Sequence, residues 1–200
     1  MARCRAFGWV HYGPWEYART LDSYFQAHQD LLGPSPRIDL HGWNVRTNTM
    51  ARRAAPPPPS RHFPGAETID SIVSGGCQIA GRVERSVLSP DVKVAKGAIV
   101  RNSVLWDGCV VEEGAIVDHV ICDKRVVIGR GARVGVGDDF VPNSEHPESL
   151  VSGISVLGMD VHIPAATQVG RNCILHPCVG SDQLQDGPVP SGATIRSPNH

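Results

Sequence analysis

The sequence has few aromatic residues, no long apolar run and almost no net charge. Phe, Trp and Tyr make up 6% of its 200 residues, whereas glycine occurs 21 times. This composition suits a thin solenoid better than a globular core. No apolar run approaches the roughly 20 residues that cross a bilayer, and a formal net charge of −1 provides no attraction for polyanions. We therefore expect neither a nucleic acid nor a membrane among its partners.

The sequence also lacks the marks of secretion and of paired cysteines. Its six cysteines form no C-x-x-C pair, and Met1–Val10 contains arginines but no apolar segment of the kind found in signal peptides. Thiols stay reduced in the cytosol, and free cysteine is commonly buried. We therefore expect buried, reduced cysteines and a cytoplasmic location.

The sequence does contain a repeat of 17 residues across its middle. Four consecutive units fall into register: Ser71–Val87, Leu88–Val104, Leu105–Ile121 and Cys122–Asp138. A glycine–alanine pair recurs at Gly97–Ala98, Gly114–Ala115 and Gly131–Ala132. Each of these glycines is expected where the chain turns sharply, because a residue without Cβ tolerates such a turn best. A fixed period of this kind indicates a repeat architecture.

Apolar residues open steps of six, six and five residues within each unit. They are Leu88, Val94, Val100, Leu105, Val111, Val117, Cys122, Ile128 and Val134. A second set follows four positions later in the longer steps: Val92, Ala98, Cys109, Ala115, Val126 and Ala132. Both sets are predicted to point into the interior of the coils. A step of six suits one short strand and a corner, and three steps close a coil that stacks about 4.8 Å from the next. We predict a mainly β fold, a left-handed parallel β-helix of hexapeptide repeats, whose left hand departs from the usual crossover rule.

The pattern breaks after Val136 and resumes at Leu157. The intervening residues 137–153 are polar and contain proline, which predicts an excursion from the β-helix. The six-residue step then returns at Leu157, Ile163, Val169 and Leu175, with Val161, Thr167, Cys173 and Val179 in the second inward set. We therefore predict a β-helix over 71–195, interrupted at 137–153, and a tail at 196–200.

The segment before the β-helix differs in kind. Thr20 is a suitable N-cap for a helix whose apolar spacing continues through Leu32, and Gly33 is a suitable stop. Pro56–Pro59 predicts a stiff linker into the β-helix. The predicted organisation before the β-helix is therefore a divergent N-terminus at 1–19 followed by a short leader helix and proline-rich linker at 20–70.

These segments together resemble a known family. Thr20–Leu32 resembles the end of the catalytic domain of bacterial ADP-glucose pyrophosphorylases (glucose-1-phosphate adenylyltransferases). Further segments resemble the linker and β-helix of that family: Asp70–Cys77, Ser86–Pro90, Ile121–Lys124 and Val189–Ala193. The resemblance covers residues 20–195 and only the C-terminal part of the family. It implies a role in making ADP-glucose and diphosphate from ATP and glucose 1-phosphate, for glycogen biosynthesis.

The nucleotidyltransferase domain of that family has no counterpart in this sequence. No Gly-rich phosphate loop is present, and the family's metal-binding aspartate aligns with Tyr17, whose phenol replaces the carboxylate that Mg²⁺ prefers. We therefore expect a truncated or frameshifted chain with no catalytic and no metal-binding residues. Mg²⁺ and ATP would belong to the missing domain, so no cofactor is expected here.

The resemblance points to one regulatory residue, Lys124. In the family, a lysine at this step of the β-helix helps to hold a phosphorylated sugar effector, and an ammonium group suits a phosphate. Arg125 and Arg130 are candidates to add to the site, although outward polar residues of a solenoid are usually just solvated. A second regulatory lysine of the family is replaced by Gln185. The family's β-helix also contributes to subunit contacts, which predicts a homo-oligomer.

Two other functions remain open from the sequence. A stand-alone hexapeptide acyltransferase would need a histidine as general base, for which His119, His162 and His176 are candidates; no second catalytic group can be paired with them from spacing. A non-enzymatic assembly module is the other alternative, because stacked coils without caps tend to associate.

Overall fold

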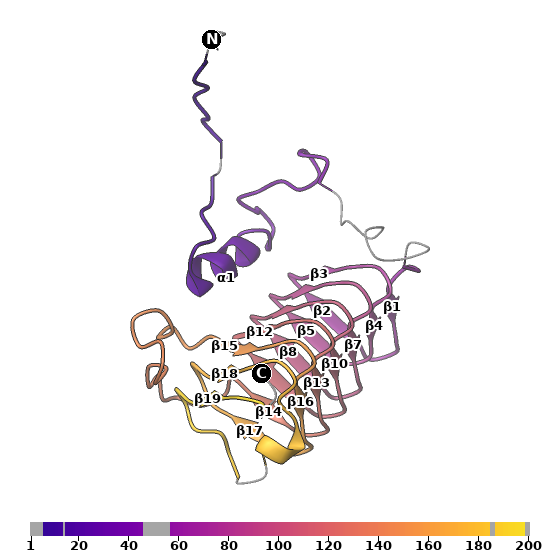
Figure 1. The fold of residues 1–200 in the computed structure, drawn as a ribbon. Helices are drawn as coiled ribbons and strands as arrows, with labels where there is room; N and C mark the ends of the chain where they lie inside the picture. The colour runs from indigo at the N-terminus through magenta and orange to yellow at the C-terminus, as the bar shows by residue number, and fades with distance from the viewer. Residues whose placement is uncertain (1–5, 14, 46–56, 185–186, 199–200) are drawn as a thin grey trace, which may run out of the picture.

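The computed structural model describes residues 6–13, 15–45, 57–184 and 187–198 of the chain (Figure 1). The first residue of the predicted linker, Pro56, and the candidate residue Gln185 therefore lie outside the described residues. The described residues form one helix followed by a three-sided parallel β-helix, which confirms the predicted fold class. No helix in these ranges combines the length and the apolar character needed to span a membrane.

The three sides of the β-helix are parallel sheets in which each strand pairs with the equivalent strand of the next coil. Sheet A contains β1 (Arg61–His62), β4 (Gln78–Ile79), β7 (Lys93–Val94), β10 (Val110–Val111), β13 (Val127–Ile128) and β16 (His162–Ile163). Sheet B contains β2 (Glu67–Ile69), β5 (Arg82–Glu84), β8 (Ile99–Arg101), β11 (Ile116–Asp118), β14 (Arg133–Val134) and β17 (Gln168–Val169). Sheet C contains β3 (Ile72–Val73), β6 (Val87–Leu88), β9 (Val104–Leu105), β12 (Val120–Cys122), β15 (Ser155–Leu157), β18 (Ile174–Leu175) and β19 (Thr194–Ile195).

The interior of the β-helix is filled by the two predicted sets of inward side chains. All of these residues are buried except Thr167, which is half-buried. Alternation along a strand places every second side chain inside, and parallel pairing then stacks like upon like, as in Leu88 over Leu105. Gly97, Gly114 and Gly131 have φ values of 71°, 71° and 65°, which confirms the sharp turns expected there.

The described cysteines are also buried as expected, with one exception. Cys77, Cys109, Cys122 and Cys173 are free and buried, whereas Cys178 is exposed. Burial raises the pKa of the Cys109 thiol to about 12, because an apolar interior disfavours the thiolate. These interior thiols therefore act as small apolar side chains.

The second coil, formed by β4, β5 and β6, is shorter than the sequence repeat predicts, whereas the first coil has the full 17 residues between Arg61 and its partner Gln78. The predicted 17-residue unit beginning at Ser71 is wrong, because Ile72 pairs with Val87 and Gln78 pairs with Lys93, 15 residues on. The shortening occurs at Gly81, where a Cβ atom would lie 2.3 Å from the carbonyl oxygen of Ala98. Glycine therefore allows this corner to be cut closely against the next coil.

The excursion leaves the β-helix between β14 and β15. Asn143 holds it in place, and its side chain is completely buried. Its amide group donates to the carbonyl oxygens of Asn172 (3.0 Å) and Gly192 (3.2 Å), and its Oδ1 accepts from the backbone N–H groups of Glu145 and His146, both at 3.0 Å. One side chain thus joins the excursion to the last coils.

Helix α1 (Leu21–Gln29) packs on the outer face of sheet C. Thr20 caps it, and Ser23 returns a hydrogen bond to the cap in a capping box. The helix ends before the predicted stop at Gly33, with Asp30 as its C-cap. Phe25 is buried against Val104, Ile121, Leu150 and Ile154. A short 3₁₀ helix, η1 (Ser181–Gln183), lies near the other end of the β-helix.

Candidate functional site

Lys124 lies in the corner that follows β12, next to helix α1. Its backbone N–H donates to Asp123 Oδ1 at 2.7 Å, which holds the corner, and its side chain is half-buried. Its Nζ lies 5.6 Å from the centre of the Trp106 ring, within the range of a cation–π contact. Among the described residues, no carboxylate forms an ion pair with this ammonium group. Its charge is therefore available to an anion.

The two arginines that could have joined Lys124 are paired with carboxylates. Arg125 Nε and Nη2 donate to the two oxygens of Asp160 at 2.7 and 2.6 Å, and this hydrogen bonding lowers the pKa of Asp160. Arg130 Nη2 lies 3.4 Å from Glu113 Oε2. Both arginines are therefore paired with carboxylates, whereas Lys124 is not.

Trp106 and Tyr24 complete the surroundings of Lys124. Trp106 follows β9, keeps 36% of its surface exposed, and donates from Nε1 to the Tyr24 hydroxyl at 2.8 Å. Burial raises the pKa of Tyr24, so its hydroxyl keeps its proton at neutral pH. The sequence did not predict this pair, whose members are separated by 82 positions. The one available signal was a tryptophan at an outward position of a solenoid poor in aromatic residues.

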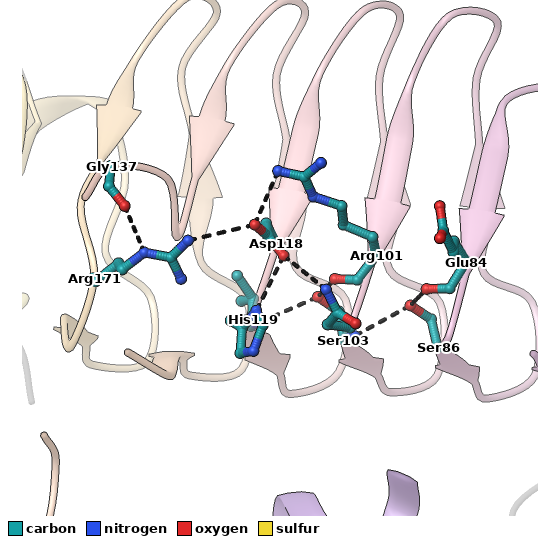
Figure 2. A network of polar contacts seen from close by, with 10 residues as sticks. Glu84, Ser86, Arg101, Ser103, Asp118, His119, Gly137 and Arg171 are labelled. Carbon is teal, nitrogen blue, oxygen red and sulfur yellow. Dashed lines mark hydrogen bonds and ion pairs between the residues drawn. The ribbon is translucent and has the colours of Figure 1, made fainter. Parts of the chain in front are cut away.

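A second polar cluster surrounds Asp118, at the end of β11 (Figure 2). Its carboxylate accepts from His119 Nδ1 at 3.1 Å and Asn102 Nδ2 at 3.2 Å. It also forms ion pairs with Arg101 Nη2 at 3.1 Å and Arg171 Nη2 at 3.5 Å. Burial acts to raise the pKa of Asp118, but the hydrogen bonds and the charge of Arg101 outweigh it and hold the pKa well below its usual value.

A row of serine hydroxyls leads to this cluster along the corner between sheets B and C. Ser86 Oγ donates to Glu84 O at 2.7 Å and accepts from the Ser103 N–H at 3.1 Å. Ser103 repeats the arrangement with Arg101 O and the Val120 N–H. The row stops at Val120, which has no hydroxyl, and the next N–H, that of Ser155, bonds to the His119 carbonyl instead. At the corner formed by Asp118 and His119, a backbone carbonyl oxygen therefore replaces the serine hydroxyl as the acceptor for the N–H of the next coil.

The three histidines considered for acyl transfer lie in different parts of the fold. His119 lies in a corner with φ 55°, and its ring stacks on Phe25 with centroids 5.8 Å apart. His162 is exposed on β16, whereas His176 follows β18 and its Nε2 is buried with no hydrogen-bond partner. Equivalent corners hold Asn102 and Asn172 in the same conformation. The conformation of His119 is therefore a property of the corner, and the structure does not bring the histidines together.

The Asp118 cluster predicts a specific pH dependence. Because folding lowers the pKa of Asp118, its contribution to stability is complete above the unfolded value of about 3.9 and is lost as the pH falls towards the folded value. We expect Asp118→Asn to be less stable than the wild type at about pH 6, and the difference to shrink below about pH 4. Urea unfolding across this range measures it, with the exposed Asp182→Asn as control. A difference independent of pH would contradict the assignment.

Comparisons with known proteins agree with this architecture. The model of the GlmU-like C-terminal hexapeptide family matches residues 60–145. Glucose-1-phosphate adenylyltransferase from Thermomicrobium roseum is 39% identical over 184 residues, which cover 92% of this chain and 42% of the relative. The enzyme from Acetivibrio thermocellus is 28% identical over the same shares of both chains, and that from Parafrankia sp. is 39% identical over 76% of this chain and 38% of the relative.

The match is confined to one part of these relatives. The chain spans about two fifths of the length of the curated relatives it matches, and the matched region is their C-terminal part. The helix and coils described above account for most of that region. The chain is therefore a homologue of the C-terminal, hexapeptide-repeat part of the glucose-1-phosphate adenylyltransferases.

Proposed function

We propose that this chain serves as the regulatory and assembly part of a glucose-1-phosphate adenylyltransferase, which forms ADP-glucose and diphosphate from ATP and glucose 1-phosphate. The similarity over 92% of the chain supports this proposal. ATP and Mg²⁺ would bind to the nucleotidyltransferase part of such an enzyme. This chain would contribute an effector site and contacts between subunits.

The observation that carries the regulatory role is the availability of the Lys124 charge. Lys124 is half-buried and free of carboxylate partners in the described ranges, whereas Arg125 and Arg130 are neutralised by Asp160 and Glu113. A phosphate group that approaches this corner meets one uncompensated ammonium group, which provides a charge-assisted hydrogen bond. We assign Lys124 the binding of the phosphate of a phosphorylated sugar.

The assembly role is supported by the outer face of sheet A. An open groove on this face is lined by Phe63, Ala80, Ala95 and Val110 together with charged residues of both signs. Apolar side chains on a flat outer face favour association of solenoids. We assign this face to contacts between copies of the chain.

Replacement of Lys124 tests the effector site. We expect Lys124→Gln to weaken the binding of glucose 6-phosphate about ten- to hundredfold, because a hydrogen bond to a charged group contributes about 1.5–3 kcal/mol. Isothermal titration calorimetry measures the dissociation constants, with inorganic phosphate as the second probe. Sedimentation velocity on the same samples reports whether copies associate.

The matched control is Lys96→Gln, which removes the same charge from an exposed corner of another edge of the β-helix. Its binding of glucose 6-phosphate should equal that of the wild type. Equal loss in both variants would indicate a general charge effect, and unchanged binding in Lys124→Gln would remove Lys124 from the site.

A further inference from the structure

We propose that Trp106 and Tyr24 transmit the occupation of Lys124 by a phosphate group to helix α1, so that the helix loosens from the β-helix when the anion binds. This inference rests on the proposed binding role of Lys124. It adds a route by which binding at one corner of the β-helix reaches a separate element of the fold.

The first link is the contact between Lys124 and Trp106. These residues occupy neighbouring coils, since Trp106 directly follows β9 and Lys124 comes two residues after β12, its partner strand. The Nζ atom lies 5.6 Å from the centre of the ring. With no carboxylate partner among the described residues, this ammonium group has the indole as its principal attractive neighbour. An anion therefore competes directly with the indole for the same charge.

The second link is the hydrogen bond between Trp106 and helix α1. The indole Nε1–H donates to the Tyr24 hydroxyl at 2.8 Å, and indole has no other polar atom. Tyr24 is in turn held by His28, whose ring lies 4.5 Å from the tyrosine ring and whose Nδ1 donates to the Tyr24 carbonyl oxygen at 2.8 Å. A shift of the indole therefore affects Tyr24 directly and, through Tyr24, the contacts of His28 one helical turn later.

Few contacts hold helix α1 to the β-helix, so the hydrogen bond from Trp106 to Tyr24 is a substantial part of its attachment. It has nine residues, a length at which helices are marginal without tertiary packing. Phe25 is its one buried residue, and Leu21 and Tyr24 pack partly against the same cluster. When the anion draws Nζ away, the indole loses its cation–π contact and is less well held as the donor to Tyr24. Helix α1 then opens more often.

Hydrogen exchange of the helix amides tests the relay in the full chain. We expect glucose 6-phosphate to speed the exchange of residues 21–29 about two- to fivefold in the wild type, the range that corresponds to the loss of one exposed cation–π contact. Tyr24→Phe removes only the hydroxyl that accepts from Trp106. This variant should bind glucose 6-phosphate as the wild type does and show no change in exchange on binding.

The outcomes separate the relay from the binding site. Binding that requires Lys124 but leaves the exchange of α1 unchanged in the wild type would overturn the relay alone. A response of equal size in Tyr24→Phe would overturn it as well, because the hydroxyl would then be dispensable.

If glucose 6-phosphate does not bind, the proposed effector site fails and a ligand-free comparison still decides the relay. Lys124→Gln should by itself speed the exchange of α1 about two- to fivefold in the wild-type background and have no effect in the Tyr24→Phe background. Equal effects in both backgrounds would show that Lys124 and Tyr24 act independently.

Discussion

Replacing Ile128 by alanine is expected to lower the free energy of unfolding by about 2–5 kcal/mol, the range for deleting a large buried aliphatic side chain. Ile128 points into the prism from β13 with 1% of its surface exposed. It stacks between Val111 and Ile163 of the neighbouring coils. Both neighbours belong to strands held by ladder hydrogen bonds, so the walls cannot collapse into the cavity.

The matched control is Ile116→Ala, which removes the same atoms from an outward, half-buried position on β11. Its cost should be well under half that of Ile128→Ala, because solvent replaces most of the lost contacts. Urea unfolding followed by circular dichroism measures both variants, and the slope of the transition must match that of the wild type. Equal losses at the two positions would contradict the three-sided interior.

Replacing Asn143 by alanine is expected to cost about 3 kcal/mol, because each buried polar group left without a partner costs about 1–3 kcal/mol. In this variant the carbonyl oxygen of Asn172 and the N–H groups of Glu145 and His146 lose the Asn143 side chain as their partner. The carbonyl oxygen of Gly192 loses one of its donors but still accepts from the Ser144 N–H at 2.8 Å. The excursion and the last coil should separate first, since this side chain is completely buried between them.

Two measurements check this expectation. Urea unfolding provides the total loss, and hydrogen exchange locates it, with faster exchange expected for the backbone at 143–146 and 192–194. Gln168→Ala, at an exposed position on β17, is the control and should change stability by less than about 0.5 kcal/mol. A loss of that small size for Asn143→Ala would show that the excursion is held by other contacts.

The interior of the β-helix could be predicted residue by residue because its contacts repeat: each inward side chain packs on the equivalent side chain of the next coil. Residues such as Leu88, Leu105 and Cys122 recur at a constant spacing, and parallel pairing of equal strands places them one above another. The burial of each follows from its place in the period. Helix α1 was predictable for a similar reason, since Thr20 and Ser23 cap it within four positions.

The shorter second coil was not predictable from the same pattern. Ile79 and Val83 are both inward and buried, yet they are four residues apart where later coils have six. The repeat hides this difference, because glycines also occur at the corresponding corners of later coils, such as Gly97, Gly114 and Gly131. Only the close approach of Gly81 to the Ala98 carbonyl shows which corner is cut.

The candidate site, too, was only partly predictable from the sequence. Resemblance to a family placed Lys124 as a residue of interest, but its partners come from contacts that no period relates. Trp106 meets Tyr24 across 82 positions, and Asp118 meets Arg171 across 53. These pairs form only because helix α1 and the resumed coils pack back on the solenoid.

The sequence alone was therefore sufficient for the solenoid, since a periodic arrangement of apolar side chains admits one way of stacking equal strands. The tertiary structure decided which charges are neutralised, which corner is short and where the helix rests. These properties depend on non-repeating side chains brought together by folding, and their separation along the chain follows no rule that a sequence pattern can express.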